Sequence, residues 1–143
     1  MAPPLRIGVR APGTRIEPAL AERVRAFAAD AFLDQAPEIV FHPQCFQSAG
    51  HFAGDDAARA KAFVEFANDP SLDAIWFARG GYGACRIADA ALAQLNDTAR
   101  AKTSLGYSDN GAILAALYAR GFAYVAHGPI PIHKTRAGGG GET

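Results

Sequence analysis

One serine, between a short apolar segment and a helical pattern, is a candidate nucleophile in this sequence. Ser108 stands two residues after Gly106 and directly before Asp109. The apolar run over 102–105 predicts a strand, and the apolar spacing over 110–120 predicts a helix. Gly106 lets the backbone reverse, and Asp109 can cap the helix that follows. This pattern is typical of a nucleophile elbow, where a helix N-terminus favours negative charge developing near the serine.

The match to the elbow pattern is incomplete. The usual pattern is Gly-x-Ser-x-Gly, whereas here the last glycine comes one place late, at Gly111. Serines in strand-to-helix turns also serve simply as caps for the backbone. Both interpretations of Ser108 therefore remain open from this stretch alone.

A second candidate feature is a turn rich in glycine, which follows an apolar run over 74–78. Its sequence is Arg-Gly-Gly-Tyr-Gly over 79–83. Glycines allow backbone N–H groups to converge, so the turn could bind a phosphate or an oxyanion. It has neither the P-loop spacing nor the dinucleotide-binding spacing. The alternative is a tight turn without a ligand, in which Arg79 pairs with a neighbouring acid instead of a substrate carboxylate.

The histidines give no metal site and one candidate base. There are four of them: His42, His51, His127 and His133. None is spaced as a metal-binding pair, so we expect no metal. His127, at the end of the last expected strand, could be a general base, but a buried histidine bonded to a backbone carbonyl is favoured. A triad of Ser108, His133 and Glu142 can be written, but the last two lie in or beside a glycine run that cannot hold geometry.

The elements that must position these turns alternate between strand and helix, as βαβαβαβαβ. This alternation predicts an α/β fold with a parallel sheet and helices on both faces, a three-layer flavodoxin-like arrangement. Sites in such sheets lie beyond the carboxyl ends of the strands, where turns beginning at Ala11, Arg79 and Gly106 would meet. The expected strands cover 5–10, 38–42, 72–79, 102–105 and 122–126, and the expected helices cover 17–33, 55–68, 84–95 and 110–120.

Composition limits the class of protein. Half of the 143 residues are hydrophobic and a fifth are charged, which indicates one globular domain, expected over 1–132 with a glycine-rich tail or linker over 133–143. The formal net charge is zero, so we expect neither nucleic acid nor a membrane surface as partner. Cys45 and Cys85 could form one disulfide, but we expect two buried thiols in a reducing compartment. No signal peptide or membrane span is apparent, and a cytoplasmic location is expected.

Four motifs in order along the chain carry a resemblance to a known family. They lie at 7–12, 79–86, 106–109 and 127–129. Together they resemble the N-terminal domain of the LD-carboxypeptidase family, which contains muramoyltetrapeptide carboxypeptidases and related microcin-immunity hydrolases. The resemblance extends over about residues 5–129.

The resemblance implies a serine peptidase without a cofactor. Ser108 would be the nucleophile, and backbone N–H groups of Asp109, Gly80 and Gly81 would form the oxyanion hole. The family removes a terminal D-amino acid from murein tetrapeptides in cytoplasmic cell-wall recycling, so the implied partner is a small peptide. The side chains expected to bind it are Arg79, Tyr82 and Tyr107.

Two departures from the family are visible. Where the family continues Asp-x-Thr after the serine, this sequence has Asp109-Asn110-Gly111. The family's catalytic Glu and His come from a second, C-terminal domain, and this chain stops before it. We therefore expect this chain to be inactive alone, and a homodimer when that domain is present. The alternatives are a microcin-immunity-type hydrolase of the same family and a non-catalytic flavodoxin-like module that binds an anion or other ligand.

Overall fold

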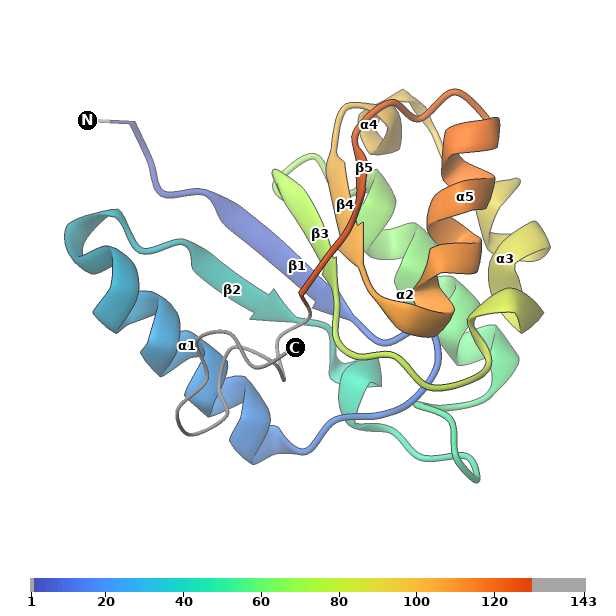
Figure 1. Cartoon of the computed structure of the whole chain (residues 1–143), viewed down its shortest axis with the longest axis horizontal. Coiled ribbons are helices and arrows are strands. Elements are labelled where there is room, and N and C mark those ends of the chain that lie inside the picture. The colour runs from blue at the N-terminus through green and yellow to red at the C-terminus, as the bar shows by residue number, and fades with distance from the viewer. Residues whose placement is uncertain (1, 130–143) are drawn as a thin grey trace.

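Five parallel strands form one sheet in the computed structural model, which describes residues 2–129 (Figure 1). The strand order is β2-β1-β3-β4-β5, so the chain changes direction across the sheet between β1 and β3. Ligand sites of such sheets lie at this switch point, beyond the carboxyl ends of the strands. The strands are β1 (Arg6–Arg10), β2 (Glu38–Phe41), β3 (Ala74–Phe77), β4 (Thr103–Gly106) and β5 (Val125–His127).

Helices cover both faces of the sheet, as the alternation of elements predicts. On one face α1 (Pro18–Phe32) packs against β1 and β2, and on the other lie α2 (Asp56–Asn68), α3 (Ala84–Leu92) and α5 (Gly111–Ala119) (Figure 1). The short α4 (Asp97–Arg100) precedes β4. The doubly wound α/β class is thus confirmed. Three short 3-10 turns complete the described elements: Leu33–Gln35, Pro43–Phe46 and Ser108–Asn110.

Two hydrophobic clusters fill the spaces on either side of the sheet. Ile75 and Phe77 of β3 face α2, α3 and α5, where Phe63 and Ile113 also pack. Trp76, between them in sequence, points to the α1 side because strand side chains alternate. Since α1 packs only over β1 and β2, an apolar groove of about 560 Å³ remains beside Trp76 and Leu105.

Several element boundaries differ from those predicted. The expected helix over 84–95 ends at Leu92, and α4 forms separately because Asn96 caps it by accepting a hydrogen bond from Ala99 N–H. The last strand begins at Val125 instead of 122. Phe122 is buried in the core, and its N–H donates a hydrogen bond to the carbonyl of Leu117 near the end of α5. Asp55 caps α2 by accepting a hydrogen bond from the N–H of Ala58.

The two cysteines have different environments. Cys45 is buried, and this burial raises the pKa of its thiol to about 12. Cys85 is exposed on the outer side of α3, because Ala84, Ile87 and Ala91 form the buried side of that helix. The expectation of two buried thiols is therefore wrong for Cys85. Among the described residues, no helix is both long enough and apolar enough to cross a membrane.

Candidate active site

Three loops meet at the carboxyl edge of the sheet, after β1, β3 and β4. The loops after β1 and β3 pack so closely that no side chain fits at Gly13. A Cβ there would lie 2.5 Å from the carbonyl oxygen of Tyr82. Gly81 is packed in the same way against the side chain of Thr14. The glycine-rich turn after β3 therefore fits against the loop after β1, and this contact holds it beside the loop after β4.

Ser108 occupies a strained position between β4 and α5. Its φ is +57°, in the left-handed region, and the only other described non-glycine residue with positive φ is Leu33. Bulkier L-residues avoid this region because Cβ approaches the neighbouring carbonyl. The turn leaves Ser108 exposed at the site edge of the sheet. This is the backbone geometry that the elbow pattern predicts.

Gly80 lies directly against this serine. A Cβ at Gly80 would stand 2.7 Å from Cβ of Ser108 and 3.1 Å from its Oγ. Only a residue without a side chain permits this approach. In the described part of the chain, the N–H groups of Gly80 and Gly81 donate no hydrogen bond.

Asp109 caps a different helix from the one predicted. Its Oδ2 accepts a hydrogen bond from the N–H of Ala84 at 2.9 Å, at the start of α3, while α5 has no side-chain cap. The 3-10 turn that begins at Ser108 directs the carboxylate away from α5. The N-cap residue of α3 is Gly83, which has no side chain that could accept a hydrogen bond from the first N–H groups of the helix. Asp109 thus links the serine turn to the glycine-rich turn.

Asn110 makes a second link between the same two turns. It is buried, and its Nδ2 donates to the carbonyl of Arg79 at 3.0 Å. Its Oδ1 is buried without a hydrogen-bond partner among the described residues. Sequence reasoning missed Asn110, although a polar residue directly after the Ser-Asp pair was a usable signal.

His127 lies at the same edge, as predicted, but not as a buried histidine. It is exposed, and its Nε2 accepts a hydrogen bond from the backbone N–H of Ser108 at 3.1 Å. Nε2 can accept only in the neutral ring that carries its proton on Nδ1. The ring also packs 4.9 Å from that of Tyr107, centroid to centroid. His127 therefore holds the backbone of Ser108, and the expectation of a buried histidine bonded to a carbonyl is wrong.

The remaining residues singled out from the sequence are distributed around this edge. Arg79 is half-buried beside the serine turn, Tyr82 is 82% exposed, and Tyr107 is 41% exposed. His133 and Glu142, as well as the tail over 133–143, lie outside the described residues.

The side chain of Arg59 hydrogen-bonds to the backbone of three loops at the site, and sequence reasoning missed this residue. Its fully buried guanidinium donates to the carbonyls of Pro12, Gly54 and Gly83. It also pairs with Asp56, which lies on the preceding turn of α2. The apolar pattern of α2 could not show this, because an arginine at this helical position is usually on the solvated side.

The charges behind the site form a small network. Asp56 also accepts from the exposed Arg86, and this hydrogen bond is the main reason that the pKa of Asp56 is below its ordinary value. Within the described residues, no group of three or more His, Cys, Asp or Glu side chains could hold a metal ion. The arrangement instead presents a serine hydroxyl beside unpaired backbone N–H groups, which suits acyl transfer.

Comparisons with known proteins show the family of this chain. A family model described as LD-carboxypeptidase N-terminal domain matches residues 7–128. A protein of Streptomyces coelicolor, whose provisional name is carboxypeptidase SCO6489, is 35% identical over 95 residues, covering 66% of this chain and 30% of its own length.

Solved structures show the same fold. The microcin C7 self-immunity protein MccF, bound to aspartyl sulfamoyl adenosine, superposes with a TM-score of 0.72 at 24% identity, covering 94% of this chain and 40% of its own. A muramoyltetrapeptide carboxypeptidase from Oxalobacter formigenes superposes with a TM-score of 0.70 at 23% identity, covering 88% and 40%. This chain thus spans less than half the length of these relatives. The chain belongs to the LD-carboxypeptidase family and corresponds to its N-terminal domain.

Proposed function

We propose that this chain is the nucleophile-bearing part of a serine peptidase that removes a terminal D-amino acid from murein tetrapeptides in cytoplasmic cell-wall recycling. The observation that carries the proposal is the left-handed φ of the exposed Ser108, in a turn that begins directly beyond β4. A serine in this position presents Oγ to a substrate above the sheet. The family membership of the chain supports the same class of reaction.

The proposed reaction is acyl transfer in two steps. Oγ of Ser108 attacks the carbonyl carbon of the L-D peptide bond and loses its proton to a general base. The resulting oxyanion accepts hydrogen bonds from backbone N–H groups of Asp109, Gly80 and Gly81. The base returns the proton to the departing amine of the D-amino acid, and water then hydrolyses the acyl-enzyme. The close approach of Gly80 to Ser108 supports this role for the glycine-rich turn.

We also propose that the general base lies outside residues 2–129. Among the described residues, no titratable side chain forms a hydrogen bond with Oγ of Ser108. Nε2 of His127 is occupied by the N–H of Ser108, so its lone pair is not available to the hydroxyl. A serine without a base is a weak nucleophile, so the chain alone should be inactive, and the complete protein, expected to be a homodimer, should supply the base.

The rim of the site suits a small peptide with a free carboxylate. Arg79 provides a guanidinium next to the serine turn, and guanidinium groups bind carboxylates with two parallel hydrogen bonds. The exposed rings of Tyr82 and Tyr107 offer apolar surface with polar tips. We assign substrate binding to these three side chains.

A second candidate is hydrolysis of an acylated nucleotide, as in microcin-immunity hydrolases. The similarity to MccF bound to aspartyl sulfamoyl adenosine favours it. The two candidates share Ser108 and differ in both the acyl group that the serine takes and the group that leaves.

A substrate comparison tests the proposal. The protein isolated from its source cells should release a D-amino acid from a murein tetrapeptide, and Ser108→Ala should abolish release, whereas the exposed Ser48→Ala should not. Cleavage of an aspartyl-nucleotide alone would favour the second candidate. Activity retained in Ser108→Ala would refute both, and anion binding without hydrolysis would indicate a non-catalytic module.

A further inference from the structure

An open apolar groove lies on the α1 side of the sheet. It has a volume of about 560 Å³, and its floor includes Trp76 of β3 and Leu105 of β4. Leu5 and Phe32 also line it, and they are 62% and 55% exposed. None of the described residues that line the groove carries a charge. Folded monomers rarely leave so continuous an apolar surface in water, so we expect another segment to cover it.

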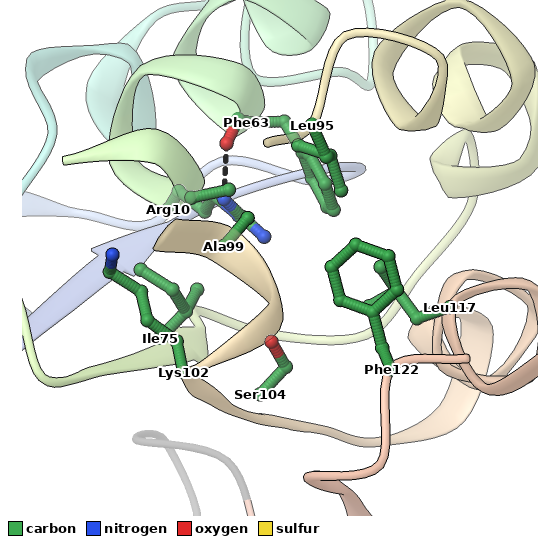
Figure 2. Close-up of a pocket in the computed structure, with 10 residues that line it drawn as sticks. Arg10, Phe63, Ile75, Leu95, Ala99, Lys102, Ser104, Leu117 and Phe122 are labelled. Carbon is green, nitrogen blue, oxygen red and sulfur yellow. Dashed lines mark hydrogen bonds between the residues drawn. The ribbon is translucent and has the colours of Figure 1, made fainter. Parts of the chain in front are cut away.

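The opposite face of the sheet is closed by comparison. Side chains alternate along a strand, so Ser104, the neighbour of Leu105, points to the side of α2, α3 and α5. Figure 2 shows Phe63, Leu117 and Phe122 around the small space that remains there, which is about 10 Å³. In the described part of the chain, the α1 side therefore has room for another segment over β3 and β4, whereas the opposite face has not.

The last described residues lead the chain from β5 to this groove. The N–H of Gly128 donates to the carbonyl of Gly106 at 2.9 Å, so the chain is still beside β4 at this point. A Cβ at Gly128 would lie 3.3 Å from Cδ1 of Leu105, on the groove floor. One residue later, the carbonyl of Pro129 accepts a hydrogen bond from the indole Nε1 of Trp76 at 2.9 Å. The chain therefore crosses from β5 over β4 toward β3 and reaches the groove at Pro129.

The sequence that follows Pro129 suits an apolar groove. Its next residues are Ile130, Pro131 and Ile132, and the first charged residue is Lys134. A residue before proline favours an extended backbone, and alternate side chains of an extended segment share one side, so Ile130 and Ile132 can face the groove together. Proline also has no N–H that would need a partner in apolar surroundings.

We propose that residues 130–132 dock in this groove, with both isoleucine side chains on Trp76 and Leu105. Three extended residues span about 10 Å, which exceeds the rise of about 7 Å along the groove floor from Ala74 to Trp76. Because the segment is attached at the edge of the groove, its effective concentration there is on the order of millimolar, which favours it over a second copy of the chain. The docked segment completes the outer layer over β3 and β4, and this docking is independent of the proposed peptidase activity.

Fluorescence of Trp76 tests the docking, because it is the only tryptophan of the chain. In the whole natural chain we expect its emission to be protected from quenching by acrylamide, to a degree that does not change when the protein is diluted. Ile132→Asp places a charge in the apolar groove, so it should raise the quenching constant, shift the emission to longer wavelength and lower the Tm by about 5 °C. Thr135→Asp adds the same charge beyond the apolar segment, and this matched control should leave the quenching constant, the emission and the Tm unchanged.

Equal quenching in the natural chain and in Ile132→Asp would overturn the proposal. Protection that is lost on dilution would also overturn it, because it would identify a second copy of the chain as the occupant. If Ile132→Asp does not fold, proton NMR of the natural chain decides the question. Nuclear Overhauser contacts between the methyl groups of Ile130 or Ile132 and the indole of Trp76 support the docking, and their absence refutes it.

Discussion

At an ordinary position a glycine variant is less stable than the alanine variant. At Ser108 we expect the reverse order, with Ser108→Gly more stable than Ser108→Ala. The φ of Ser108 is +57°, and an L-residue in the left-handed region is strained by about 1–2 kcal/mol, whereas glycine is not. Glycine in turn destabilises the folded state by about 0.5–1 kcal/mol, because the unfolded chain gains freedom. The strain is larger, so Ser108→Gly should be more stable than Ser108→Ala by about 0.5–1 kcal/mol.

Both variants remove the hydroxyl, so the difference in stability between them reports the strain of the backbone at this position. For a chain of this size, the difference corresponds to a Tm about 2–4 °C higher for the glycine variant. Differential scanning calorimetry of the two variants measures it without any need for activity. Ser48, exposed and without positive φ, is the matched position: there the glycine variant should be the less stable of the two. If Ser108→Ala proved as stable as Ser108→Gly, Ser108 would not be in the elbow conformation.

Three further predictions concern the surroundings of the site. Gly80→Ala should lower stability by about 1–3 kcal/mol in urea unfolding, because the new Cβ meets the elbow serine at 2.7 Å, while Gly111→Ala, with only ordinary contacts, should change it by less than about 1 kcal/mol. Arg59→Met should cost about 3 kcal/mol or more, because it leaves the buried carbonyls of Pro12, Gly54 and Gly83 without their donor. Arg86→Met, at a side chain 57% exposed, should cost less than about 1 kcal/mol, and similar losses for the two variants would contradict the role given to the buried guanidinium. A thiol reagent should modify Cys85 in the folded protein and the other cysteine only after unfolding, and two fast-reacting thiols would contradict the burial described.

The architecture could be predicted from the sequence because each element carries its own periodic signal. The apolar run around β3, bounded by a proline-containing segment and a glycine-rich turn, left few alternatives to a central parallel strand. The location of the three loops at the carboxyl edge then follows from general rules for alternating α/β chains, whereas the strand order was not predicted because those rules allow more than one order. The less regular end of α3 and the start of β5 were misplaced, because the caps and core contacts that determine them come from distant residues.

The side-chain partners at the site could not be predicted in the same way. Asp109 has the local signature of a cap for α5, but the 3-10 turn directs it to α3, a partner 25 residues earlier in the chain. Arg59 reaches three loops that are separated in sequence and adjacent only in the folded chain.

Covalent labelling of the complete protein would show whether Ser108 is the nucleophile. The protein isolated from its source cells would be treated with a fluorophosphonate while it hydrolyses a murein tetrapeptide, and the label would be located by peptide mass spectrometry. We expect a label on Ser108, with D-amino acid release lost in proportion to labelling. A label on another residue, or release that continues after Ser108 is fully labelled, would contradict it.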